Sequence, residues 1–209
     1  QAQNTSIIKD IRIWVDKDSA NPTMELKNIL SELGLEKSNL GVEYEAYGLT
    51  GRNAIQLNNS LKNFTALHDK SELVSYLRVI KSDAEIIFVK KAAELADCAM
   101  EVAWKYAHAG QGEAKILAEM QGVIFEGGGD YPANEFIIGS GKNALLCRYQ
   151  SEKRKLSDVD QLSLEWAGTY KHYHSCLFRT ILIGKANDKQ KKMQAAWNKA
   201  ITLSEKKIK

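Results

Sequence analysis

A short stretch in the last third of the chain gathers side chains that can carry acid–base or nucleophilic chemistry. It holds a carboxylate (Glu165), two imidazoles (His172 and His174), a thiol (Cys176) and a guanidinium (Arg179). A carboxylate can act as nucleophile or general base, and an imidazole, which titrates near neutral pH, can carry the proton. The carboxylate also interrupts an otherwise apolar run, where an unpaired buried charge is costly. These residue types form a candidate catalytic group.

The same stretch has the pattern of a β-hairpin, and its composition places the turn near Gly168 and Thr169. Side chains alternate across a strand, so the two histidines and the cysteine, each two residues apart, are expected to share one face. We expect all five candidate groups to converge there. The alternative is that Glu165 pairs with Arg179 and the histidines only donate hydrogen bonds.

The elements before this hairpin divide the chain into two parts. Residues 1–80 alternate between short strands and helices, which predicts a small α/β layer domain. The strands are expected at 11–15, 40–45 and 64–68, and the helices at 22–33 and 49–61.

The pattern changes at residue 81, where Ser82 and Glu85 form a capping box that opens a long helix. The helices of this second part are expected at 82–107, 113–125 and 188–209, and the strands at 136–138, 144–149, 161–167, 170–175 and 178–183. The fold class predicted is therefore α/β (α+β), with a domain boundary between residues 80 and 81.

The composition excludes several classes of protein. The 209 residues are 44% hydrophobic and 26% charged, a globular mix, and no apolar run reaches the about 18 residues of a membrane span. A net charge of +3 is too balanced to predict a nucleic-acid partner. Three widely spaced cysteines indicate reduced thiols, and hence a cytoplasmic protein. The expected partners therefore include neither nucleic acid nor membrane.

Beyond these patterns, the chain resembles the creatinase/prolidase/aminopeptidase P superfamily, whose catalytic domain is the two-repeat pita-bread fold. The stretches that carry the resemblance are 77–86, 110–113, 140–149 and 160–180, in the family's order, while 11–45 fit the end of a creatinase-type N-terminal domain. The resemblance implies that 1–80 is the C-terminal part of that N-terminal domain and that 81–209 is the first catalytic repeat. We therefore expect a fragment that lacks the second repeat, is inactive alone and is a homodimer when complete.

The departures from the family pattern concern the metal ligands. The family's metallopeptidases place aspartate ligands at two positions of the hairpin, which here hold Glu165 and Cys176, and Arg148 stands where a histidine is usual. The hairpin is more similar to the metal-independent branch, which includes creatinase and ectoine hydrolase. This similarity implies no metal cofactor; the alternative is a divalent ion such as Mn, Co or Zn.

The resemblance to that branch implies roles for the hairpin residues. Glu165 would act as nucleophile or general base on a C–N bond of a small nitrogenous solute, similar to ectoine or creatine. His174 or His172 would carry the proton.

Substrate binding is implied for Arg179, Arg148 and Tyr149, because paired guanidinium donors suit a substrate carboxylate. Two other functions remain open. One is an Xaa-Pro aminopeptidase or dipeptidase with diverged metal ligands, which would take a dipeptide substrate. The other is a binding module on the same fold that has lost catalysis.

Overall fold

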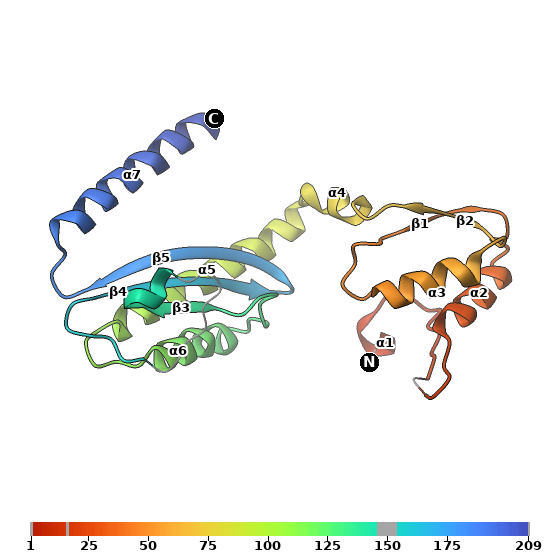
Figure 1. The fold of residues 1–209 in the computed structure, drawn as a ribbon, viewed down its shortest axis with the longest axis horizontal. Coiled ribbons are helices and arrows are strands. Elements are labelled where there is room, and N and C mark those ends of the chain that lie inside the picture. Colours follow the sequence, from red (N-terminus) through yellow and green to blue (C-terminus); the bar gives the residue numbers. More distant parts are fainter. Residues whose placement is uncertain (1, 16, 146–153, 209) are drawn as a thin grey trace. The chain divides into compact units, whose positions relative to one another are not determined.

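The computed structural model describes residues 2–15, 17–145 and 154–208. The chain forms two compact units, Gln1–Ile80 and Lys81–Lys209 (Figure 1). In the described residues, no helix has the length and apolar character needed to cross a membrane.

The first unit is built on a parallel pair of short strands. Its elements are α1 (Ala2–Thr5), α2 (Pro22–Glu32), β1 (Asn39–Val42), α3 (Gly51–Leu61), β2 (Ala66–Asp69) and α4 (Leu73–Val79). Asn21 caps α2 by accepting a hydrogen bond from Met24 N, and Thr50 caps α3 in the same way. Leu57 and Leu61 of α3 are buried. The β1–α3–β2 arrangement confirms the predicted α/β pattern for residues 40–68.

The strand predicted at residues 11–15 is wrong, because that segment has no regular structure. Its apolar side chains Ile13, Trp14 and Val15 are exposed. Alternation of apolar residues supplies a face for a strand, but a strand also needs a hydrogen-bonded neighbour. In the described part of this unit, the sheet consists of β1 and β2 alone.

The second unit is an antiparallel sheet with helices packed on it. Its elements are α5 (Asp83–Tyr106), α6 (Glu113–Glu126), β3 (Ile137–Ser140), η1 (Gly141–Leu145), β4 (Asp160–Tyr170), β5 (Tyr173–Ile183) and α7 (Asp188–Ile208). The sheet order is β3-β4-β5, and α5 packs against β4 and β5 while α6 contacts α5 and β3 (Figure 1). The predicted strand at 144–149 is wrong at its start, where η1 occurs; its last four residues lie outside the described ranges.

The start of α5 is tied to the tip of the hairpin. Ser82 and Glu85 form the predicted capping box, and the Tyr173 hydroxyl donates to Glu85 over 2.8 Å. Hydrogen bonds from the backbone and hydroxyl of Ser82, and then from Tyr173, lower the pKa of Glu85 to about 2. Phe88, one turn further along α5, contacts the rings of Tyr170 and Tyr173. The helix and the hairpin therefore hold each other in place.

The hairpin turn lies three residues beyond its predicted position. β4 and β5 pair without interruption over eleven residue pairs, and the turn is formed by Lys171 and His172, with φ of 49° and 65°. Two successive residues with positive φ are typical of a type I′ turn. The predicted turn residues, Gly168 and Thr169, lie inside β4 instead.

Close packing of β4 against the backbone of α5 requires a glycine at position 168. A Cβ added there would lie 2.0 Å from Ala92 O and 2.5 Å from Ala96 N, both backbone atoms of α5. Two residues earlier, the Trp166 indole N–H donates to Ala96 O over 3.0 Å. β4 thus approaches the backbone of α5 closely, and this contact defines the helix side of the sheet.

Replacing Gly168 by alanine is expected to lower the free energy of unfolding by about 3 kcal/mol, since backbone atoms of two elements must separate. The matched control is Gly122→Ala in α6, where an added Cβ meets nothing within 4 Å. That variant is expected to gain about 0.5–1 kcal/mol from helix propensity. Urea unfolding of both variants measures the difference, and equal stabilities would contradict the close approach.

Candidate active site

One face of the hairpin carries three of the predicted catalytic groups. Cross-strand partners share a face, and the register pairs Glu165 with Phe178, Ala167 with Cys176, and Thr169 with His174. This face is opposite to the helix side, because Trp166 and Gly168 alternate with these residues. Glu165 and Cys176 are both exposed. Glu165 is exposed although its cross-strand partners on this face, Ile137 and Phe178, are both apolar.

The other two groups lie elsewhere, so the expected convergence of all five is wrong. Arg179 pairs with Leu164, which places it on the helix side of the strand, and its Nη1 donates to Phe178 O over 2.8 Å. His172 is a turn residue, and its positive φ removes it from the alternation of β5. Its backbone N–H donates to Asp130 Oδ2 over 3.1 Å.

His174 is held by two hydrogen bonds that fix its tautomer. Ala133 N donates to Nε2 over 2.9 Å, and Nδ1 lies 2.9 Å from His172 O. An amide N–H can only donate and a carbonyl oxygen can only accept, so the neutral ring carries its proton on Nδ1. Both ring nitrogens are therefore engaged. His174 joins the loop that follows α6 to the start of β5.

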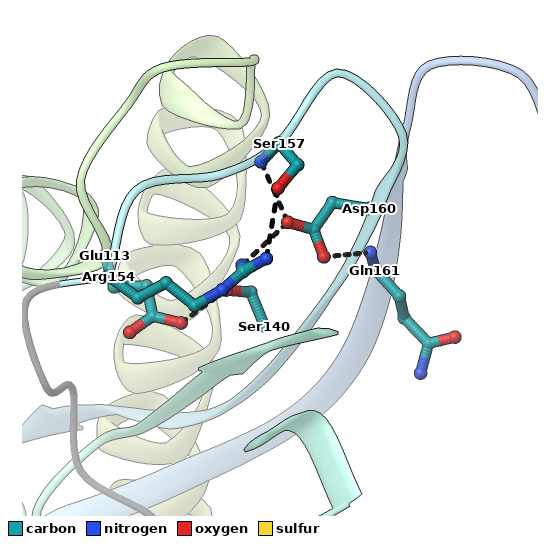
Figure 2. Close-up of polar contacts among 6 residues, drawn as sticks. All are labelled: Glu113, Ser140, Arg154, Ser157, Asp160 and Gln161. Atoms are coloured by element: carbon teal, nitrogen blue, oxygen red, sulfur yellow. Dashed lines mark hydrogen bonds and ion pairs between the residues drawn. The ribbon is translucent and has the colours of Figure 1, made fainter. Parts of the chain in front are cut away.

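A second polar group, shown in Figure 2, surrounds the first residue of β4. Asp160 accepts hydrogen bonds from Arg154 Nη1 (2.6 Å), Ser157 N (2.9 Å) and Gln161 N (2.9 Å). Burial alone would raise the pKa of Asp160, but the two amides and the guanidinium outweigh it and hold that pKa below its ordinary value. The carboxylate is therefore charged in the folded protein at neutral pH.

The same guanidinium connects Asp160 to a fully buried acid of α6. Arg154 Nη1 also donates to Ser140 Oγ, which donates to Glu113 Oε1 over 2.5 Å (Figure 2). Glu113 N in turn donates to Arg154 O over 2.9 Å. This polar network joins the first turn of α6, the end of β3 and the start of β4, five residues before Glu165.

The sequence contained only part of the signal for this network. The motifs at 110–113 and 140–149 include Glu113 and Ser140, and Asp160 opens the predicted hairpin stretch. Arg154 was not predicted, because nothing in its local sequence distinguishes it from other surface cations. The predicted binding residues Arg148 and Tyr149 lie outside the described residues.

The face of the hairpin that points away from α5, the open face, has donor atoms that do not fit a pair of divalent metal ions. Glu165 and Cys176 offer one hard and one soft ligand, and both nitrogens of His174 are engaged. Across the residues that the structure describes, no three or more His, Cys, Asp or Glu side chains are grouped to hold a metal ion. Zinc sites in proteins use three or four protein ligands.

Comparison with known proteins identifies relatives. The sequence model of metallopeptidase family M24 matches residues 88–209. An Xaa-Pro dipeptidase from Pyrococcus horikoshii is 27% identical over 190 residues, 82% of this chain and 54% of that protein. An ectoine hydrolase from Halomonas elongata is 25% identical over 195 residues, 82% of this chain and 49% of that protein.

The fold is also found among solved structures. An Xaa-Pro dipeptidase from Bacillus anthracis superposes with a TM-score of 0.72 at 28% identity, covering 83% of this chain and 47% of that chain. The mixed α/β class and the likeness to the pita-bread proteins are confirmed by this match. The chain spans about half the length of the curated relatives it matches.

The polar network predicts an acid-dependent loss of stability at Asp160. The hydrogen bonds and the ion pair of the charged Asp160 carboxylate stabilise the folded state, and their full contribution is present when the pH is above the ordinary aspartate pKa of about 3.9. This contribution is lost as the pH falls through the lowered pKa of Asp160 in the folded protein. Asp160→Asn is therefore expected to cost about 2 kcal/mol at pH 7 and progressively less below pH 4.

Urea unfolding at pH 7, 5 and 3 measures this difference. Asp158→Asn is the matched control, since Asp158 is exposed in the same loop and its replacement is expected to change stability by less than about 0.5 kcal/mol. A cost at Asp160 that stays constant from pH 7 to pH 3 would contradict the assignment.

Proposed function

The chain belongs to metallopeptidase family M24, whose model covers more than half of it, and from this membership we propose that it supplies one half of the active site of a hydrolase that cleaves C–N bonds. Residues 81–209 would be its first catalytic repeat and residues 1–80 the end of its N-terminal domain. The relatives named Xaa-Pro dipeptidase and ectoine hydrolase support this class of reaction. The activity belongs to the complete protein, since the chain spans about half of those relatives.

The observation that carries the proposal is the placement of Glu165, an exposed carboxylate on the open face of the hairpin, with exposed Cys176 diagonally across on the neighbouring strand. Glu165 would act as general base on a small nitrogenous solute similar to ectoine or creatine. It takes a proton from water, the water oxygen bonds to the carbonyl or amidine carbon, the C–N bond breaks, and the proton passes to the leaving nitrogen. As a nucleophile it would instead form an acyl intermediate that water hydrolyses. The proposed reaction needs no metal ion.

The proton carrier in this proposal is His174 or His172. His174 accepts Ala133 N–H at Nε2, so it can take up a proton there only after this hydrogen bond breaks. His172 lies in the exposed turn, where its ring meets no such constraint in the described contacts. His174 therefore serves first to hold the loop, and proton transfer by it is coupled to a movement of that loop.

Substrate binding is proposed for Arg179, with Arg148 and Tyr149 retained from the family resemblance. Arg179 is exposed and lines a groove at the edge of β5 together with Phe178 and Thr180. A substrate carboxylate bound there would lie at the edge of the sheet, and its reacting carbon would have to reach over the strand to Glu165.

The second candidate is an Xaa-Pro peptidase that uses a divalent ion. The observation that favours it is that the two positions of the family's aspartate ligands, Glu165 and Cys176, share the open face. These two residues would then be ligands, and the remaining ligands would come from outside this chain. The ion would supply Lewis acidity at the scissile carbonyl.

The variant that tests the proposal is Glu165→Gln in the complete protein that contains this chain. Turnover of ectoine or creatine is expected to fall at least about 100-fold, because the amide cannot accept the proton. Stability is expected to change by less than about 0.5 kcal/mol, since the side chain is exposed. Glu126→Gln, an exposed carboxylate of α6, is the control and is expected to retain full turnover.

The wild-type assay also includes a Gly-Pro dipeptide, with and without chelator. Turnover of a small solute that survives chelation supports the metal-independent reaction. Chelator-sensitive cleavage of Gly-Pro overturns it in favour of the peptidase. Hydrolysis of none of the three would overturn both and leave a binding module.

A further inference from the structure

Glu165 lies between two large apolar side chains on the open face of the hairpin. The strand register places Ile137 of β3 on one side of it and Phe178 of β5 on the other. Opposite residues on neighbouring antiparallel strands have Cβ atoms about 4.5–5.5 Å apart, so both side chains lie next to that of Glu165. Glu165 is also the one residue of β4 that is exposed. The carboxylate is therefore presented beside an aromatic ring.

The neighbouring rows of the open face consist of small residues. Gly139, Ser163 and Thr180 are opposite one another in the row toward the start of β4, and Ala167 is opposite Cys176 in the row toward the turn. Successive side chains on one face of a strand are about 7 Å apart along it. These short side chains project less far from the sheet than a phenyl ring, so they leave the ring of Phe178 accessible from the space above Glu165.

Glu165 has no counter-charge among the described residues. Its carboxylate takes part in none of the ion pairs found there. The three strands of the sheet contain a single lysine or arginine, Arg179, and it lies on the helix side. Apolar neighbours remove part of the hydration of a charged group, which favours binding of an opposite charge from a ligand.

We propose that Phe178 is the specificity-determining residue of this site, and that it selects substrates whose reacting carbon belongs to an amidinium or guanidinium group. Such a group is planar, delocalised and weakly hydrated, so it stacks on an aromatic ring. One of its N–H groups would donate to one oxygen of Glu165, and the second oxygen would accept the proton of the attacking water. The inference rests on the proposed function, because it takes Glu165 as the group that meets the substrate.

Other substrate classes fit this pair of side chains less well. The carbonyl of a peptide bond is neutral, so it gains no cation–π attraction from the ring. An alkylammonium group carries its charge on a single, strongly hydrated nitrogen and has no flat face to place on the ring. The arrangement of Glu165 and Phe178 therefore favours an amidine or a guanidine over an amide.

The atoms and charges of the reaction balance for such a cation. The water oxygen bonds to the amidinium carbon while one water proton passes to Glu165, and the C–N bond then breaks as that proton passes to the leaving nitrogen. The products are an amide or a urea and a protonated amine, which together retain the single positive charge of the substrate.

Binding of a small planar cation tests the role of the ring without turnover. The probe is acetamidinium, and acetamide is its neutral analogue of similar shape; NMR titration into the complete protein that contains this chain measures both affinities. Phe178→Leu is expected to weaken acetamidinium binding about 3- to 30-fold, the value of a cation–π contact, and to change acetamide binding by less than about twofold. Phe178→Tyr keeps the ring and is expected to bind acetamidinium within about twofold of the wild type.

Two further variants serve as controls. Phe125→Leu makes the same substitution in α6, where the ring contacts Tyr131, and is expected to change neither affinity. Glu165→Gln is expected to abolish the preference for acetamidinium over acetamide. Equal acetamidinium affinity of the wild type and Phe178→Leu would overturn the proposal, and so would an equal loss for acetamide or a wild type without preference for the cation.

Kinetics with ectoine separate this inference from the proposed hydrolysis. Phe178→Leu is expected to raise KM by the factor found for acetamidinium and to leave kcat within about twofold, because the ring contacts the cation before and during the reaction. Hydrolysis of ectoine that is indifferent to Phe178 would keep the hydrolysis and overturn the role of the ring. A protein that hydrolyses neither ectoine nor creatine but binds acetamidinium through Phe178 would overturn the hydrolysis and retain the cation site.

Discussion

The close approach of α5 to β4 is the contact on which the rest of the second unit depends. Four alanines of α5, Ala92, Ala96, Ala99 and Ala103, are completely buried, and their small size lets the helix backbone reach the strand. Gly168 accommodates that backbone and Trp166 donates a hydrogen bond to it. Because alternation along a strand is strict, this contact decides which residues of β4 face α5 and which, Glu165 among them, face the opposite side.

The open face follows from that contact and from the two ends of β4. At one end, the polar network around Asp160 fixes where the strand begins; at the other, Glu85 and Asp130 hold the turn through Tyr173 and His172. With both ends fixed, a slip by one residue would bury Glu165 against α5 and expose its apolar neighbours. The position of the candidate carboxylate is therefore set by packing and hydrogen bonds on the opposite side of the sheet.

Local signals in the sequence predicted the elements well, and failed where a residue serves a distant partner. The capping box at Ser82 and the apolar periodicity of α5, α6 and α7 need no information beyond their own segment. Gly168 suggested a turn because, in sequence, a glycine that makes room for a distant helix looks the same as a turn glycine. The error placed His172 in a strand instead of the turn. Arg179 lies on the other face for a separate reason: it is three residues from Cys176 and therefore alternates with it along β5. Arg154 was missed for the same reason, since its hydrogen-bond partners Ser140, Asp160 and Glu113 come from three separate elements.

The open face and the outer edge of β5, which has no partner strand among the described residues, belong to the same hairpin, so a strand that pairs with this edge also acts on the candidate chemistry. Phe178 is the cross-strand partner of Glu165 and the central residue of β5. A strand added beside β5 would place its own side chains within reach of Phe178 and Cys176, and so would form one wall of the space above Glu165. The carboxylate would then lie in a less solvated site, where a general base is more effective. The solvation of the proposed reacting group therefore depends both on Ile137 and Phe178, its neighbours in this chain, and on whatever strand pairs with β5.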